Sequence, residues 1–337
     1  MNLNIVNAEE IDRHKWSSFI EKHPGGSIFQ TPDFFHVCEE TKRYEPRLLA
    51  AVDGSDKIQA LLLTVFIREL GGPLGKLSSR SIAQGGPLFL DTDEGRSALK
   101  HLMKEYDKIA KKKALYSQLR NLHDVTAFQA LFQELGYEYE EHLNYIIDLD
   151  KSEDELFAAL SKERRYGVRK CSKAGTSVVE IKEVDEVERA YSLLEQTYKK
   201  ARLPLADISL FESAFKVLAP KKMIKMFLAE KDGAPASTIM LLIYKGVIYD
   251  WYAGASAEHL NLCPNDLITW HAIRYGMGSG ASVFDFGGAG KPSERYGVRE
   301  FKKQFGGRTV NYGRFIKIHN PRNFRIAEKG FQMLRKL

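Results

Sequence analysis

Residue types that could support acyl transfer lie close together in the last quarter of the sequence. Asp285 stands within an apolar segment, Gly287 and Gly288 follow it, and Lys302 lies between two phenylalanines a few residues later. Attack of an amine on a carbonyl passes through a tetrahedral oxyanion, which a fixed cation stabilises. Lys302 is therefore a candidate for charge stabilisation, and the alternative is a solvated lysine on a basic helix.

Two roles are open to the carboxylate of Asp285. It could accept a proton from the attacking ammonium group, or it could orient a backbone turn at the end of a strand. Glycines such as Gly287 and Gly288 allow a sharp turn or a close approach of the backbone to a ligand. We expect these two glycines to shape the loop of the site rather than to bind phosphate.

A second candidate site is a cluster of cations between residues 162 and 173. A single acid, Glu163, opposes six basic side chains in this segment: Lys162, Arg164, Arg165, Arg169, Lys170 and Lys173. Such a cluster could bind a pyrophosphate group or the backbone of RNA. The alternative is a solvated face of a helix.

The motifs of several other chemistries are absent from the sequence. The nine histidines never occur as H-x-x-x-H or H-E-x-x-H, so we expect no metal site. The three cysteines, Cys38, Cys171 and Cys263, lack CxxC spacing, which argues against zinc and disulfides and for a reducing compartment. There is no Gly-x-Ser-x-Gly elbow and no P-loop, so neither a hydrolase nor an ATPase is indicated.

Local patterns predict the elements that would position these residues. Residues 247–252 are β-branched and aromatic, as in a packed strand, and Gly254 is expected to end it. Alternation along that strand would send either Trp251 or Tyr252 towards a cleft, although core packing is the more common fate of such aromatics. The helix that follows is expected to start at Pro264 with Asn265 as its cap.

Two further elements complete the second half of the chain. Residues 283–286 form a predicted strand ahead of the glycine loop, and a basic helix with Lys302 comes after that loop. A helix that starts around Leu156 and Leu160 is expected to run on into the cationic cluster.

The two halves of the chain follow one plan. With 337 residues the chain is too long for a typical single core. LLAAVDGSDKIQALLLTVF (48–66) and KMFLAEKDGAPASTIMLLIY (225–244) each indicate a strand, a charged turn with Asp-Gly and a longer apolar strand. The next strand, helix and strand also correspond. We infer a duplication of an α+β unit, with a junction near residue 150.

Composition and charge predict a cytoplasmic protein with a modest bias towards polyanions. The net charge is +6, and no apolar run is long enough to span a bilayer. The first residues carry Glu9 and Glu10 and no apolar signal core. The basic stretch 308–336 could contact RNA or an anionic membrane face. Its alternative is a terminal helix packed through Phe324, Phe331 and Leu334.

Four pieces of the sequence, in order, resemble the second half of the Fem-type peptidoglycan bridge enzymes: YAGA at 252–255, the helix of Trp270, DFGG at 285–288, and FK at 301–302 with FG at 305–306. The resemblance continues more weakly to the N-terminus. It implies an α+β fold of two tandem GNAT-like (acyl-CoA N-acyltransferase) domains, each a mixed, mostly antiparallel sheet flanked by helices. The expected parts are residues 1–149, residues 150–317, and a basic C-terminal helix at 318–337 that packs back on the first domain.

The resemblance also assigns roles to particular residues. It gives the oxyanion role to Lys302, and it places Arg165 and Arg169 near a substrate groove. Arg202 matches a position where the family uses an arginine on the pyrophosphate of the acceptor. His36 falls near a family lysine with the same task, and a histidine would be a weaker, pH-dependent phosphate ligand. Tyr252 matches the tyrosine of the YAG pattern and is a further candidate substrate contact.

The implied activity is direct attack of an acceptor amine on an aminoacyl-tRNA, without a further cofactor. The acceptor would be a lipid- or nucleotide-linked cell-wall precursor, which adds an expected peripheral contact with the inner membrane face. The alternative is an acyl-CoA-dependent N-acyltransferase in cell-surface polysaccharide synthesis, although no clean Q/R-x-x-G-x-G/A loop for acyl-CoA occurs. A third reading is a non-catalytic module that binds RNA or anionic lipid. The sequence carries no signal for an oligomeric state, and no coiled-coil arm is expected.

Overall fold

The computed structural model describes residues 3–69 and 78–336, with side chains up to residue 329. The chain forms two compact units: unit 1 contains Met1–Glu141 and Tyr312–Leu337, and unit 2 contains His142–Asn311. Each unit is a sheet flanked by helices, so the α+β prediction is confirmed. Among the described residues, no helix combines the length and the apolar character needed to cross a bilayer.

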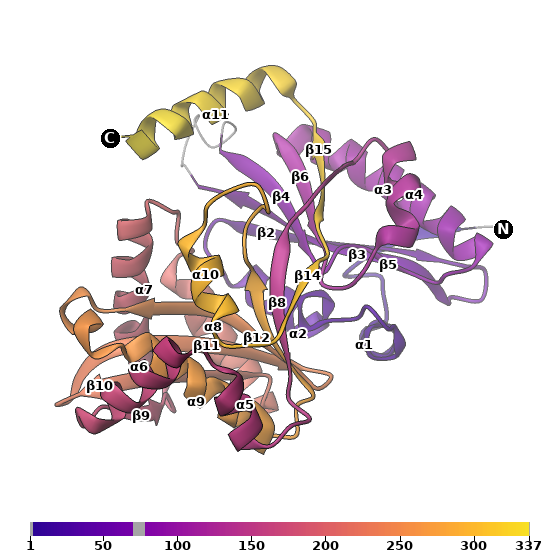
Figure 1. Ribbon diagram of the computed structural model, residues 1–337. Coiled ribbons are helices and arrows are strands. Elements are labelled where there is room, and N and C mark those ends of the chain that lie inside the picture. The colour runs from indigo at the N-terminus through magenta and orange to yellow at the C-terminus, as the bar shows by residue number, and fades with distance from the viewer. Residues whose placement is uncertain (1–2, 70–77, 337) are drawn as a thin grey trace. The chain divides into compact units, whose positions relative to one another are not determined.

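The sheet of unit 1 has the strand order β1-β2-β3-β4-β6-β15-β7, with β5 paired to β3 (Figure 1). Its strands are β1 (Asn4–Asn7), β2 (Tyr44–Val52), β3 (Ile58–Arg68), β4 (Ser79–Gln84), β5 (Leu88–Phe89), β6 (Tyr116–Arg120), β7 (Glu138–Glu140) and β15 (Arg314–Ile318). Its helices are α1 (Arg13–Lys22), α2 (Pro32–Glu39), α3 (Asp93–Lys113), α4 (Gln129–Glu134) and α11 (Pro321–Lys336). Helix α3 packs on β2 and β3, where its apolar face closes one core.

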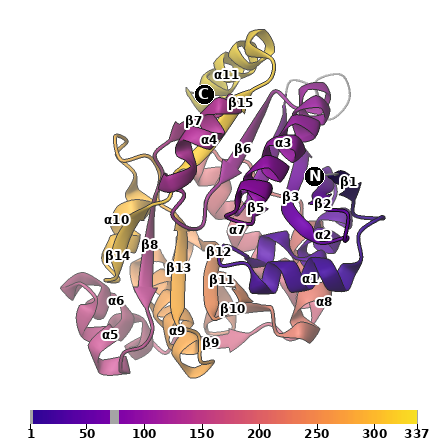
Figure 2. The ribbon, with the colours of Figure 1, turned by 90° about the vertical axis from the view of Figure 1, so that its right-hand side faces the viewer.

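The sheet of unit 2 has the order β9-β10-β11-β12-β13-β8-β14, and β8 lies between β13 and β14 (Figure 2). Its strands are β8 (Leu143–Asp148), β9 (Ser177–Glu180), β10 (Ile224–Lys231), β11 (Ala234–Tyr244), β12 (Val247–Ala255), β13 (Val283–Gly288) and β14 (Arg308–Asn311). Its helices are α5 (Glu153–Ala159), α6 (Lys162–Lys173), α7 (Val187–Ala201), α8 (Ile208–Leu218), α9 (Pro264–Gly278) and α10 (Gly297–Lys303). Helix α9 shares a core with α5, α6 and one face of the sheet, while α7 packs on β11 and β12.

The two sheets repeat one plan, which supports the inferred duplication. In each, one parallel pair, β4 with β6 or β12 with β13, interrupts an otherwise antiparallel order. The division of the chain differs from the predicted 149/150 and 317/318 boundaries. Strand β8 pairs with β13 and β14 in unit 2, and β15 pairs with β6 and β7 in unit 1. Strand pairing over such separations has no local sequence signal, so a repeat pattern alone misplaces the boundary.

Three local predictions were wrong. Strand β12 runs on through Gly254, where a Cβ would lie 2.8 Å from the Leu193 carbonyl oxygen, so this glycine permits close approach of α7 rather than ending the strand. Helix α9 does begin at Pro264, but its N-cap is Cys263 rather than Asn265. The single helix expected across 156–173 is two, α5 and α6.

The break between α5 and α6 has a local explanation. Leu160 is extended, and the Ser161 side chain accepts a hydrogen bond from the Arg164 N–H, which starts α6 anew. In the tail, the Phe324 ring lies 5.4 Å from that of Tyr116, as the packed-helix alternative expects. The other two expected anchors, Phe331 and Leu334, lie outside the residues whose side chains are described.

Candidate active site

The sheet of unit 2 opens between its two parallel strands. Strands β12 and β13 pair only as far as Tyr249 and Asp285, and beyond that point β12 continues beside β11 and β13 beside β8. In unit 1 the equivalent strands stay paired up to Gln84 and Arg120, where both end. Backbone groups that face such an opening are not paired strand to strand and form hydrogen bonds with other groups instead. The opened sheet of unit 2 is therefore the candidate site, in contrast to the closed strand pair of unit 1.

The Lys302 ammonium group is held at this opening by the backbone. Its Nζ donates to the carbonyl oxygen of Phe286 at 2.5 Å and to that of Gly288 at 2.9 Å. Burial lowers the pKa of Lys302, and the nearby carboxylates of Asp250 and Asp285 oppose that effect. An ammonium group has three N–H donors, so one remains for a substrate oxygen. Lys302 is thus a positioned cation rather than a solvated one.

Asp285 holds the glycine loop in place. Its Oδ1 accepts hydrogen bonds from Nδ2 of Asn144 at 2.6 Å and from the N–H of Gly287 at 2.7 Å. Gly287 has a φ of +68°, a conformation that favours glycine. Burial raises the pKa of Asp285, although both hydrogen bonds act in the opposite direction. These contacts match the turn-orienting alternative, and they fix the carbonyl groups that bind Lys302.

Asp250 belongs to the same group of charges and is missing from the sequence-based candidates. It follows Tyr249, the last residue of β12 that pairs with β13, and so lies where the strands part. Burial raises its pKa to about 6, with Lys302 lowering it and Asp285 raising it further. Among the described residues, no donor forms a hydrogen bond with its carboxylate. An acid within the apolar run VIYDWYAGA was the signal that could have revealed it.

Tyr252 lies in an aromatic cluster beside the opening. Its ring is 4.8 Å from Phe211, 5.8 Å from Tyr198 and 5.1 Å from Trp251. The register of β12 against β11 shifts at Trp251, which forms a bulge. Because of this bulge, Trp251 and Tyr252 both contact Phe211, so the predicted alternation between them was wrong.

Arg202 ends helix α7 in an unusual conformation. It is exposed and left-handed, with φ 52° and ψ 42°, and its N–H donates to the carbonyl oxygens of Tyr198 and Lys199. A non-glycine residue in this region costs roughly 1 kcal/mol. Since the Tyr198 ring also meets Tyr252, two of the predicted substrate contacts lie at the same end of α7.

Arg165 and Arg169, the two cluster cations that the resemblance places near a substrate groove, have contacts within unit 2. The Arg165 guanidinium donates to the carbonyl oxygens of Ala158 and Leu160, at 2.7 and 2.5 Å, which caps the end of α5. Arg169 lies over the Phe157 ring, 5.2 Å from its centre. In these contacts the two guanidinium groups stabilise the junction between α5 and α6. A role for them in substrate binding stays a prediction.

His36 lies in unit 1 on helix α2 and is exposed. Its Nδ1 is 3.4 Å from Oε2 of Glu39, so an anion would have to compete with that carboxylate. Among the residues that the structure describes, no three His, Cys, Asp or Glu side chains gather as they would around a metal ion.

Comparisons with known proteins bear on the fold and on the class of protein. Residues 159–303 match the model of the acetyltransferase (GNAT) domain. A lipid II:glycine glycyltransferase of Staphylococcus haemolyticus is 21% identical over an alignment of 412 positions, gaps included, that covers 97% of this chain and 95% of that protein. The crystal structure of FemX has a TM-score of 0.70 at 20% identity, covering 97% of this chain and 99% of that one. A tandem GNAT protein from the clavulanic acid pathway has a TM-score of 0.61 at 11% identity, with 95% and 99% covered.

The fold and the opened sheet define an acyl- or aminoacyltransferase built from two tandem GNAT-like units. Within that class, the chain is similar over nearly its whole length to a Fem-type protein, the lipid II:glycine glycyltransferase of Staphylococcus haemolyticus. It lacks the coiled-coil arm of some family members, because the longest helices within residues 142–311, all of which are described, have 15 residues.

Proposed function

We propose that this protein transfers an aminoacyl group from aminoacyl-tRNA to an amine of a lipid-linked cell-envelope precursor. The observation that carries the proposal is the Lys302 ammonium group, fixed by two carbonyl oxygens where β12 and β13 part. The likeness to lipid II:glycine glycyltransferases extends over nearly the whole chain, which supports the same kind of acceptor here. No cofactor and no enzyme-bound intermediate are needed.

The reaction can be written with the residues at the opening. The acceptor nitrogen attacks the aminoacyl carbonyl carbon, and the resulting oxyanion lies against the remaining N–H of Lys302. Asp250 takes the proton that the attacking nitrogen loses, a role suited to a carboxylate whose pKa is raised to about 6. The carbonyl group then re-forms as the C–O bond to the tRNA ribose breaks, and the leaving ribose oxygen takes up the proton that Asp250 accepted. Asp285 keeps the loop that orients Lys302.

Binding of the two substrates raises the rate further, because it holds the reacting groups close together. Arg202, exposed at the end of α7, would bind the pyrophosphate of the acceptor. The exposed cations of α6, Lys162 and Lys173 among them, would attract the tRNA backbone. Because the acceptor is lipid-linked, the protein would work at the inner membrane face.

A label-transfer experiment tests the proposal. The protein is incubated with a pool of labelled aminoacyl-tRNAs and a lipid-linked precursor extract, with and without ribonuclease. Ribonuclease-sensitive label in the lipid fraction, lost in Lys302→Ala and kept in Lys303→Ala, supports it. Lys303 is the matched control, since it is the exposed neighbour on the same helix.

The runner-up is transfer from an acyl-CoA, which the match of residues 159–303 to an acetyltransferase domain favours. The same extract is therefore offered labelled acetyl-CoA. Transfer from acetyl-CoA without transfer from aminoacyl-tRNA would overturn the tRNA donor and establish the alternative.

A further inference from the structure

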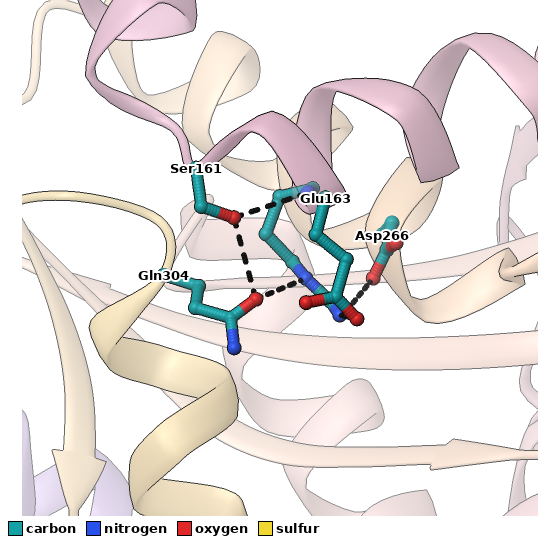
Figure 3. A network of polar contacts seen from close by, with 5 residues as sticks. Ser161, Glu163, Asp266 and Gln304 are labelled. Atoms are coloured by element: carbon teal, nitrogen blue, oxygen red, sulfur yellow. Dashed lines mark hydrogen bonds and ion pairs between the residues drawn. The ribbon is translucent and has the colours of Figure 1, made fainter.

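One ion-pair network in unit 2 joins the Lys302 helix to two other helices. From α6, Arg164 donates through Nη1 to Oδ1 of Asp266 on α9 at 2.5 Å, and through Nε to Oε1 of Gln304 at 2.9 Å. Its guanidinium also lies over the Phe301 ring, 5.1 Å from the centre. Figure 3 shows Ser161, Glu163, Asp266 and Gln304 converging at this point. One side chain thus contacts residues on both sides of Lys302.

The network is buried more deeply than a surface ion pair. The side chains of Arg164 and Asp266 are 14% and 4% exposed. Burial raises the pKa of Asp266 to about 6 even though Arg164 favours its charged form. A buried ion pair of this kind adds little stability over apolar residues of the same size. Its value to this protein must then lie in the geometry it specifies.

The surrounding backbone is adapted to this network. A Cβ on Gly167 would lie 1.8 Å from Oδ2 of Asp266, so only glycine lets α6 cross the carboxylate at this distance. The Ser161 N–H donates to the Gln304 carbonyl oxygen at 2.8 Å, and its Oγ lies 3.3 Å from Oε1 of Gln304. The end of α10 is therefore tied to the start of α6 through both backbone and side chains.

Helix α10 depends on such contacts for its position. It has seven residues, and no side chain caps its N-terminus. Isolated helices this short are unstable in water, so tertiary contacts decide where α10 lies. The buried Phe305, 5.7 Å from the Phe286 ring, fixes its depth. The contacts of Arg164 with Phe301 and Gln304 fix the rotation of α10 about its axis and the position of its C-terminal end.

We propose that Arg164 is a positioning residue that keeps Lys302 on the carbonyl oxygens of Phe286 and Gly288, with Asp266 and Gln304 orienting its guanidinium. The link to catalysis rests on the proposed function. The positioning itself does not, and it can be measured on the protein without any substrate.

The first test measures the titration of Lys302 by competitive acetylation with acetic anhydride over a pH series, read by peptide mass spectrometry. In Arg164→Met we expect the midpoint for Lys302 to rise towards that of an ordinary lysine, because the ammonium group leaves its carbonyl partners for water. The acids that face Lys302, Asp250 and Asp285, remain in place. The matched control is Arg274→Met, which breaks an exposed ion pair of the same unit with Glu153 and should leave the midpoint unchanged.

A double variant separates positioning from stability. Arg164→Met with Asp266→Leu replaces the buried pair by apolar side chains and should recover most of the thermal stability that Arg164→Met loses. If Lys302 remains displaced in this stable variant, the positioning role is supported. A wild-type midpoint for Lys302 in either folded variant would overturn it.

Activity provides the second readout. Once transfer is detected, Arg164→Met should lower kcat by about tenfold or more with little change in KM, since it disturbs a contact with the transition state. Arg164→Lys should recover little, because an ammonium group cannot reach two partners in the same plane. If wild-type protein transfers label from no donor, the proposed function fails, while the titration still decides the role of Arg164.

Discussion

Lys302 Nζ and the carbonyl oxygen of Phe286 lie 2.5 Å apart, which joins helix α10 to the end of strand β13. This contact occurs where β13 and β12 separate, beyond the pairing of Tyr249 with Asp285. A cation is thereby fixed where the sheet of unit 2 opens.

Lys302→Ala should lower kcat/KM by about 10²–10³-fold, the typical effect of losing one donor to a developing oxyanion. Circular dichroism and the melting temperature should change little, because water can reach the carbonyl groups that Lys302 leaves. Lys303→Ala, on the exposed side of the same helix, should keep wild-type kinetics. Equal losses in both variants would show that the helix as a whole, and not the ammonium group, matters.

Asp250→Asn should remove the acid limb of the pH–rate profile. In the wild type the carboxyl group, with its pKa raised to about 6, is protonated below that pH and cannot accept a proton. The rate should therefore fall about tenfold for each pH unit below 6, and the variant should be slow without that dependence. Asp232→Asn is the control, since this residue lies in a left-handed turn that asparagine adopts readily. A wild-type acid limb in Asp250→Asn would exclude this role for Asp250.

The stability of the protein should decrease between about pH 4 and 7 through Asp250 and Asp266. Both have folded-state pKa values raised from 3.8 to about 6, so in this window the native state binds more protons than the unfolded chain. The free energy of unfolding then falls as pH rises, by up to about 1.4 kcal/mol per pH unit for each group. Urea titrations at several pH values should show wild type losing stability relative to Asp266→Asn as pH increases. A constant difference would contradict the raised pKa.

Gly167→Ala should destabilise the protein by about 1–3 kcal/mol although alanine favours helices more than glycine does. The added Cβ would lie 1.8 Å from Oδ2 of Asp266, which must move away from Arg164. Gly278→Ala, at the end of α9, meets nothing within 4 Å and should leave stability equal or slightly higher. Chemical denaturation of both variants measures the difference, and a neutral Gly167→Ala would mean that α6 does not approach Asp266 so closely.

Local pattern was enough to predict much of the fold. Helix α2 starts at the pair Thr31-Pro32, which is typical of a helix N-terminus, and Thr31 Oγ1 accepts from the Phe34 N–H at 3.2 Å, because capping depends on neighbouring residues only. The hairpin of β2 and β3 and its counterpart of β10 and β11 are confirmed. Each follows from alternating or continuous apolar runs around an Asp-Gly turn.

The site was predicted only in part. The FK motif and the glycine loop indicated Lys302 and Asp285, and the structure brings both to the opening of the sheet. Asp250 and the positioning contacts of Arg164 were not recognised, because their roles depend on burial and on neighbours far away in the sequence. Asp266, for example, is 102 residues from Arg164.

Composition, periodicity and capping residues determined the duplicated α+β plan and the strands and helices that build it, since these follow from interactions within a few residues. Tertiary structure alone decided that β8 joins unit 2 and β15 joins unit 1, and that β12 and β13 part at Asp250. It also decided the directions in which the pKa values of Asp250, Asp285 and Lys302 shift. The physical reason is that all three depend on groups that the chain brings together only when it folds. This holds for the placement of β8 and β15 in their sheets, for the opening of a sheet and for the pKa of a buried carboxyl group.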